Sequence, residues 1–343
     1  LRLVTWFGDV PFFTTNPTLP ESRVVKVTPA ATIKEFIHSE LAEVAEILPK
    51  NTDIPESENG RYTRGTAVAL NARAYLYDND FENCAIWCDK LINSTEYGTY
   101  ALEQDYKKLF HDQSCCYGPE SIMTIEFATL GGIDNIVRSW NNFNAFVPQS
   151  IGNKGVTTQS PTQELVDQYE NVKYNSSTAL ESYPVVDLAL PYRDNTHLKP
   201  NFNPENTIFD QVSNPYGDRD PRFYVTVVYN ECVRTAFWKN EEIDGRSGVH
   251  YVGNAIRSKT IWTNKEDDYT GIHSSRRQRT RTGYYLNKYL KPSEGENAGG
   301  SVKYKIFRLA EIILNTAECA INAGHIQEGM TLVNEIRDRA GMP

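Results

Sequence analysis

The chain has 343 residues and a formal net charge of −9 at pH 7, from 35 Lys and Arg against 44 Asp and Glu residues. This acidic balance argues against binding to the phosphate backbone of nucleic acids. No apolar run reaches about 18 residues, so the sequence predicts no membrane-spanning helix. Six cysteines in this length do not make a disulfide scaffold.

Both ends of the sequence are abrupt. It begins with "LRLVTWFGDVPFF", without Met or a helix cap, and stops with "RDRAGMP" directly after a predicted helix. We therefore expect a piece of a longer protein, truncated at both ends, in which a missing targeting segment carries little information.

The first long predicted helix runs from Thr28 to Leu48. Its apolar residues recur three and four positions apart, which is typical of one helical face. Thr28 is the expected cap, Pro29 suits the first helical position and Pro49 ends the helix. His38 falls on the polar side, where we expect it to be solvated.

A predicted pair of helices follows in "ALNARAYLYDNDFENCAIWCDKLINS", residues 69–94. The turn-forming run from Asp78 to Asp80 separates two apolar-periodic stretches. Because two helices approach closely only where both present small side chains, Ala72 and Cys84 are the expected contact. Trp87 in this pair, like Trp6 near the start, is expected in the core.

The end of the chain, "RLAEIILNTAECAINAGHIQEGMTLVNEIRDRAG", repeats this pattern. Ala317 and Gly329 have the same separation as Ala72 and Cys84, and Gly324 falls where Asn79 stands in the first pair. Two copies of one geometry indicate tetratricopeptide-like hairpins, whose repeat is about 34 residues. A coincidence of two helical patterns is the alternative.

The middle of the chain has weaker periodicity. "SIMTIEFA" predicts a short strand, and "SPTQELVDQYE" predicts a helix capped by Ser160. In "GDRDPRFYVTVVYN", the alternation of Phe223, Val225, Val227 and Tyr229 predicts a strand. Beyond Asn230 the chain is expected to be rich in loops until a further possible strand in "GYYLNKYL".

The predicted fold is therefore mainly α: a tetratricopeptide-like helical hairpin scaffold with an irregular, loop-rich subdomain that contains a few short strands. Residues 1–111 form the first part of the scaffold, including the hairpin at 64–94. Residues 112–302 form an insert with a helix near 161–170, and residues 303–343 form a hairpin that packs back on the scaffold. Long irregular segments in compact proteins usually carry function.

Taken together, the segments resemble the SusD/RagB family of outer-membrane nutrient-binding lipoproteins. The matching pieces occur in the family's order and span nearly the whole chain: "WFGDVPFFT", "AEILP", "GRYTRGTAVALNARAYLY", "DFENCAIWCDKLINSTEYGTY", "SPTQELVDQYE", "DRDPRFYVTVVYN", "TGYYLNKYL", "FRLAEIILNTAECAINAG" and "LVNEIRDRAGMP". The family's lipid-bearing N-terminal cysteine and its continuation after the last motif are missing here.

This resemblance implies a surface-exposed lipoprotein of a Gram-negative outer membrane, attached only through an N-terminal lipid anchor that this chain lacks. Its partners would be an oligosaccharide, or in some members a peptide, and a SusC-like TonB-dependent transporter that imports the ligand. In the family the helical scaffold faces the transporter and the irregular insert carries the ligand site. No catalysis and no cofactor are implied.

A sugar site needs flat aromatic rings flanked by planar hydrogen-bonding groups. Three loop tryptophans have such neighbours, and the resemblance favours the two between "DPRF" and "GYYLNKYL". The candidate ligand-binding residues are Trp238, Trp262, Trp140, Asn141, Asn142 and Tyr269. The alternative for each tryptophan is a structural role, in which its side chain packs against the scaffold and anchors its loop there.

Metal sites and catalysis have little support in the sequence. The cysteines lack the spacing of a zinc site, so we expect Cys84 and Cys88 to be buried apolar residues, and the acidic run before Tyr269 lacks the pattern of a calcium loop. No motif fixes the carboxylate pair of a glycoside hydrolase. The second alternative is a tetratricopeptide module that binds peptides on helices around Tyr75 and Trp87.

Overall fold

The structure of the protein is a computed structural model that describes residues 1–112, 116–126, 160–174, 180–191, 216–244, 248–260, 280–289 and 303–343. The chain forms two compact units, each assembled from several stretches of sequence. The first unit contains Leu1–Glu103, Cys116–Ile125 and Lys305–Ile336, and the second contains Gln104–Cys115, Glu126–Tyr304 and Arg337–Pro343.

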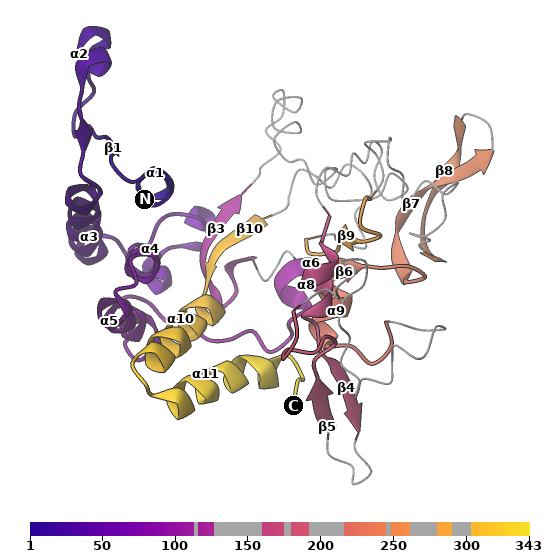
Figure 1. Ribbon diagram of the computed structural model, residues 1–343. Coiled ribbons are helices and arrows are strands. Elements are labelled where there is room, and N and C mark those ends of the chain that lie inside the picture. Colours follow the sequence, from indigo (N-terminus) through magenta and orange to yellow (C-terminus); the bar gives the residue numbers. More distant parts are fainter. Residues whose placement is uncertain are drawn as a thin grey trace. The chain divides into compact units, whose positions relative to one another are not determined.

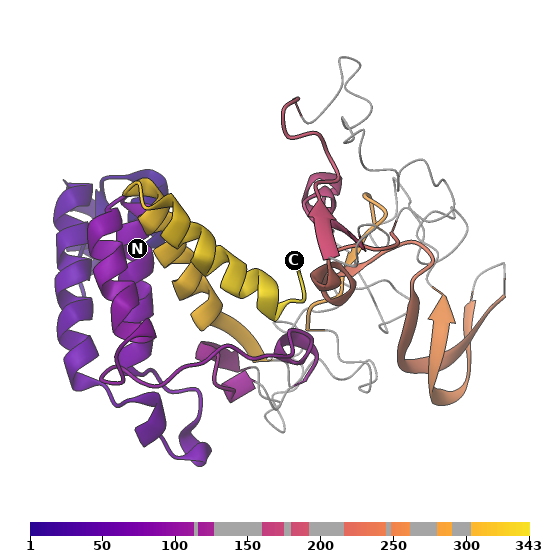
Figure 2. The same ribbon diagram turned by 90° about the horizontal axis from the view of Figure 1, so that it is seen from below.

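The first unit is mainly helical. Helix α4 packs between α3 and α5, and α10 packs against α5, so these helices lie side by side (Figure 2). The elements carried by this part of the chain are α1 Arg2–Phe7, β1 Val10–Pro11, α2 Leu19–Val24, β2 Val27–Thr28, α3 Ala30–Ile47, η1 Asn51–Asp53, η2 Glu56–Glu58, α4 Arg64–Tyr77, α5 Phe81–Ile92, β3 Ser121–Glu126, β10 Lys303–Arg308, α10 Leu309–Asn322 and α11 Ile326–Arg339 (Figure 1).

The two predicted helical hairpins are present as α4–α5 and α10–α11. Ala72 and Cys84 are both fully buried, and Ala317 is 1% exposed. The two turns also correspond, because Asn79 and Gly324 both have left-handed backbones, with φ of 56° and 85°. Gly and Asn adopt this conformation more readily than other residues do, so the turn residues fix where each hairpin reverses.

Gly329 shows why the second hairpin needs a small residue. A Cβ atom built at this position would lie 2.9 Å from the carbonyl oxygen of Ala317 and 2.4 Å from Cγ1 of Ile321. The Ile321 side chain is 41% exposed and has room to move, whereas the backbone oxygen of Ala317 does not. Helices α10 and α11 therefore meet through direct backbone contact at Gly329.

His38 is not solvated, contrary to the expectation from its position on the polar face of α3. Its ring stacks on Tyr75 of α4, with the ring centroids 3.6 Å apart and an interplanar angle of 13°. Nδ1 lies 2.6 Å from Oδ1 of Asn71, and Nε2 lies 3.5 Å from the carboxylate of Asp78. His38 on the polar side of α3 is thus part of the contact with α4, which periodicity alone could not reveal.

Trp6 is 74% exposed, so the prediction that it lies in the core was wrong. It projects from α1 beside Phe7, which is 68% exposed, while Val4 is the buried residue of this helix. The start of α3 also differs in detail. Pro29 is its N-cap, Thr28 belongs to β2, and the backbone N–H of Ala30 donates to Asp9 Oδ1 at 2.8 Å.

The carboxylate of Glu120 joins the parts of the first unit that are distant in sequence. Its side chain is fully buried, forms an ion pair with Arg308 and accepts a 2.9 Å hydrogen bond from the backbone N–H of Glu103. The Glu120 carbonyl accepts from the N–H of Leu309 at 3.0 Å, and β3 pairs with β10. Nearby, Arg73 of α4 makes a bidentate pair with Glu311 of α10, at 2.7 and 2.6 Å.

The second unit contains short helices and two-stranded sheets in its described parts. Strand β4 pairs with β5, β6 with β9 and β7 with β8, all antiparallel. Its core cluster consists of two valines, Val166 and Val227, and five aromatic residues, Phe223, Tyr284, Tyr169, Tyr216 and Tyr229. The elements are α6 Lys108–His111, α8 Gln163–Asp167, β4 Asn171–Tyr174, β5 Leu180–Tyr183, α9 Pro221–Thr226, β6 Val227–Val228, β7 Val233–Asp244, β8 Gly248–Thr260 and β9 Tyr285–Leu286.

Three predictions for this unit need correction. The segment from Pro221 to Thr226 is helix α9, and only Val227 and Val228 form a strand. The stretch after Asn230 holds the long β7–β8 hairpin where loops were expected. Helix α8 is capped by Thr162, whose hydroxyl accepts from the N–H of Leu165, and Ser160 lies outside it. The strand predicted in "SIMTIEFA" is confirmed as β3.

Replacing Gly329 with Ala is expected to lower the free energy of unfolding by about 1–3 kcal/mol, because the new methyl group would force α10 and α11 apart. Urea denaturation measures the change. Gln327→Ala, at an exposed position of the same helix, is the matched control and should cost less than about 0.5 kcal/mol. Equal effects of the two substitutions would show that the close contact at Gly329 does not exist.

Glu120→Ala is expected to destabilise the protein by about 3 kcal/mol, because it removes the buried carboxylate that pairs with Arg308 and accepts a hydrogen bond from the Glu103 N–H. Glu311→Ala removes a similar pair whose carboxylate is 31% exposed, so it should cost about 1 kcal/mol or less. Denaturant unfolding of both variants provides the comparison. A larger loss of stability from Glu311→Ala would contradict the assignment of Glu120 as the main interaction that joins the distant parts of the first unit.

Candidate functional site

Helix α9 places an arginine at the surface of the second unit. Asp220 caps α9, because its carboxylate accepts from the backbone N–H of Arg222 at 2.8 Å, and Pro221 occupies the first helical position. The same carboxylate, 2% exposed, binds the Arg222 side chain through Nε at 3.0 Å and Nη2 at 2.6 Å. One buried aspartate therefore starts the helix and fixes the guanidinium.

The ion pair with Asp220 keeps Arg222 positively charged. Burial by itself lowers the pKa of an arginine, but the hydrogen bond and negative charge of Asp220 outweigh burial and raise the pKa of Arg222 above its ordinary value. Since free arginine is already protonated at neutral pH, Arg222 stays cationic at every physiological pH.

A tight turn before α6 presents Tyr106. Asp105 Oδ1 accepts from the backbone N–H groups of Lys107 and Lys108, at 2.9 and 3.3 Å, which holds the turn. The Tyr106 ring packs edge-on against the buried Phe110 at a centroid distance of 5.2 Å. The guanidinium carbon of Arg339 lies 5.4 Å from the centre of the Tyr106 ring, within the range of a cation–π contact.

The last turn of α11 is held within the second unit by Arg337. Its Nη2 donates to Glu170 Oε2 and to Ser182 Oγ, both at 2.9 Å. Burial tends to raise the pKa of Glu170, but the hydrogen bonds from Arg337 and Ser182 outweigh it, so the pKa of Glu170 is lowered. This anchor positions Arg339 and the residues that follow it.

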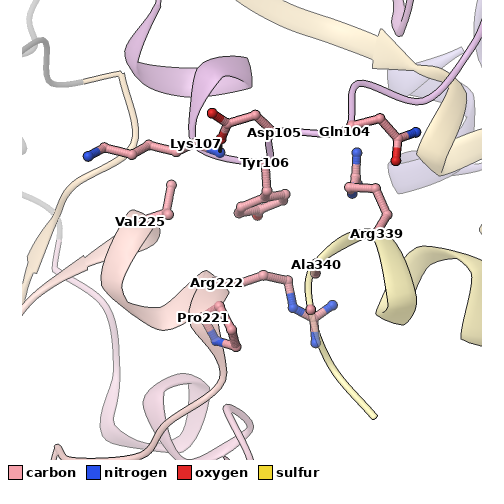
Figure 3. Close-up of a pocket in the computed structure, with 10 residues that line it drawn as sticks. Gln104, Asp105, Tyr106, Lys107, Pro221, Arg222, Val225, Arg339 and Ala340 are labelled. Carbon is pink, nitrogen blue, oxygen red and sulfur yellow. Dashed lines mark hydrogen bonds between the residues drawn. The ribbon is translucent and has the colours of Figure 1, made fainter.

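These three segments line an open pocket of about 520 Å³, within the usual size range of small-molecule sites. All its lining residues belong to the second unit. Figure 3 shows the Tyr106 ring pointing into the pocket, with Arg339 and Arg222 on one side and Val225 on the other. The lining consists of residues 104–107, Pro221, Arg222, Val225 and residues 339–341.

The pocket combines an aromatic ring with planar and charged hydrogen-bonding groups. Gln104 offers an amide, and Arg222 and Arg339 offer guanidinium groups. Among the residues that line the pocket, Asp105 is the single carboxylate, and it already caps the turn before α6. The lining therefore suits the binding of a polar molecule and lacks the facing pair of carboxylates that hydrolysis of a glycoside requires.

Comparison of the sequence with known protein families identifies the family to which this chain belongs. The sequence profile of the SusD family matches residues 119–343. This chain belongs to the SusD family. The match includes the segments that carry Arg222 and Arg339, together with the whole of the predicted insert after residue 119. No curated protein matches the chain in sequence.

Solved structures with a SusD-like fold are similar to all of this chain. A SusD-like protein from Bacteroides fragilis has a TM-score of 0.65 and 22% identity, and the match covers 100% of this chain and 59% of that one. A SusD-like carbohydrate-binding protein from the same species has a TM-score of 0.65 and 21% identity, and the match covers 100% of this chain and 57% of that one. Surface glycan-binding protein A from Bacteroides uniformis has a TM-score of 0.55 and 20% identity, and the match covers 100% of this chain and 56% of that one. The present SusD-family chain thus spans less than two thirds of these relatives.

The described structure does not test the candidate residues named from the sequence. Trp238 lies in β7, where its backbone is opposite Ala255 of β8. Trp140, Asn141, Asn142, Trp262 and Tyr269 lie outside the described residues. The pocket of this SusD-family protein was not predicted. Its signal in the sequence is "QDYK", a tyrosine between an amide, a carboxylate and an ammonium group.

Two further features concern membrane crossing and metal binding. Within the described ranges, no helix is both long and apolar enough to cross a membrane. In the same parts of the chain, no group of three or more His, Cys, Asp or Glu side chains is placed to hold a metal ion. Cys84 and Cys88 are fully buried with their sulfurs 4.0 Å apart, and the contact with Cys88, together with burial, raises the pKa of the Cys84 thiol.

The Glu170–Arg337 pair predicts a pH dependence of stability. Because the pKa of Glu170 is lowered in the folded state, its contribution is fully present above the unfolded pKa of about 4.3 and is lost as the pH falls through the folded value. At pH 7, Glu170→Gln should cost about 0.5–1 kcal/mol, and the difference from the native chain should shrink as the pH falls below about 4. Urea unfolding at several pH values measures it. A difference that stays constant with pH would contradict the assigned pair.

Proposed function

We propose that this chain binds oligosaccharides at the outer surface of a Gram-negative bacterium and passes them, chemically unaltered, to a SusC-like TonB-dependent transporter. Membership of the SusD family carries the proposal, since the family match includes the insert from residue 119 onward. Two of the similar structures are named as carbohydrate-binding or glycan-binding proteins. Attachment through an N-terminal lipid and the transporter partnership are parts of the same proposal.

The ligand site is proposed to lie in the insert. Trp238 and Trp262, with Trp140, Asn141, Asn142 and Tyr269, remain the predicted contacts, because indole rings stack on the CH faces of sugars while amides bind the hydroxyl groups. The second unit also contains the pocket around Tyr106, which has the same kinds of group.

The contacts of the scaffold favour this proposal over a peptide-binding tetratricopeptide module. Tyr75 is stacked on His38. Trp87 packs against the core of the first unit, and the ammonium group of Lys90 lies 5.0 Å from the centre of its ring. Both aromatic residues that a helical peptide groove would use therefore already have partners within the scaffold.

Trp238→Ala and Trp262→Ala are each expected to weaken oligosaccharide binding about tenfold or more with the fold intact, because each removes a stacking ring. A glycan array followed by calorimetry measures the change, and circular dichroism checks the fold. Trp6→Ala is the matched control, since Trp6 is exposed but belongs to the first unit. Unchanged affinity in both insert variants would remove these residues from the site, and hydrolysis of a bound glycan would contradict the non-catalytic assignment.

A further inference from the structure

The pocket around Tyr106 has a local charge opposite to that of the chain. Arg222, Arg339 and Lys107 line it against Asp105, whereas the whole chain carries a net charge of −9. The buried carboxylate of Asp220 binds Arg222 from within the unit. A cationic pocket in an acidic protein attracts an anionic ligand at short range.

We propose that this pocket binds the acidic sugar unit, a uronate, of an oligosaccharide ligand. The inference rests on the proposed function and names its substrate class: glycans that contain carboxylate groups. The same pocket would discriminate against neutral glycans. A bound neutral glycan displaces water from the cationic side chains but offers no negative charge in its place, so the lost solvation is not compensated.

Arg222 is prepared to bind a carboxylate. Its Nε and Nη2 donate to Asp220, and Nη1 makes no hydrogen bond to any residue in the described ranges. The pair with Asp220 holds the guanidinium in one orientation, so little side-chain entropy is lost when Nη1 binds a ligand. Arginine–carboxylate hydrogen bonds are among the strong polar contacts in proteins.

Tyr106 supplies the complementary contact for the sugar ring. Figure 3 shows its ring between Val225 and the two arginines, where the apolar face of a pyranose can lie on it while a carboxylate on the same sugar reaches the guanidinium groups. The volume of about 520 Å³ accommodates a sugar unit. Ring stacking and charge recognition therefore meet in one pocket.

An acidic peptide has the same charge but fits the pocket less well. Extended peptides are commonly bound through backbone hydrogen bonds along a strand edge. The segments that line this pocket are a turn, the helix α9 and the end of α11. None of these lining segments offers a strand edge, so the lining favours a compact ring over an extended chain.

The test uses the full chain and a panel of oligosaccharides in matched pairs, each uronate-containing member beside its carboxyl-reduced neutral form. Array screening and calorimetry should show binding to uronate members at least about tenfold tighter than to their reduced forms, with an affinity that falls as salt is raised. Arg339→Gln should abolish this preference and Arg339→Lys should restore part of it. Lys108→Gln, a cation next to the pocket that does not line it, should leave the preference unchanged.

The outcomes separate the two proposals. Equal binding of both members of each pair, or a uronate preference that survives in Arg339→Gln, overturns the acidic-sugar inference and leaves the proposed function intact. Binding of no member of the panel overturns both. A tetraglutamate peptide that binds as tightly as the uronates, and is lost in Arg339→Gln, assigns the pocket to acidic peptides instead.

Discussion

The buried carboxylate of Glu120 is the point at which three distant stretches of the chain meet. It holds the Arg308 side chain and the Glu103 backbone, and its own carbonyl binds the first residue of α10. A charge removed from water in this way stabilises a fold only when its partners are in place. The interaction therefore requires the C-terminal hairpin to return to the helices formed by the first hundred residues.

This pairing explains how the fold accommodates a long insert. The chain leaves the helical unit through β3 and returns through β10, and these two strands pair with each other. The hydrogen bonds of β3 with β10 and the ion pairs of Glu120 and Glu311 fix both ends of the insert. In the second unit, local hydrogen bonds position the segments of the pocket. Asp220 holds α9 and Arg222, Asp105 holds the turn that carries Tyr106, and Arg337 holds the end of α11.

The helical part of the fold could be predicted because its determinants are local. Asn79 and Gly324 mark the turns, and small residues at Ala72, Cys84, Ala317 and Gly329 mark the contacts. Prediction failed where local signals conflict. The alternation from Phe223 to Tyr229 indicates a strand, but the cap at Asp220, Pro221 and the burial of Phe223 favour a helical turn first. The exposure of Trp6 and the contact of His38 with α4 depend on neighbours that periodicity does not specify.

The pocket could not be predicted, because Tyr106, Arg222 and Arg339 lie on segments that are distant in sequence and meet only through the packing of the second unit. The tryptophans of the insert could be named because each has polar neighbours along the chain, and their role in binding remains a proposal. The sequence thus identifies single side chains suited to sugars more readily than it identifies which of them share a site.

Hydrogen–deuterium exchange of the full chain, with and without a saturating oligosaccharide, tests the central claim that a helical scaffold displays a ligand-binding insert. The account predicts slower exchange on binding in residues 104–112 and 216–289, with α4, α5 and α10 unchanged. Slower exchange in α4 and α5, with residues 104–112 and 216–289 unchanged, would contradict it.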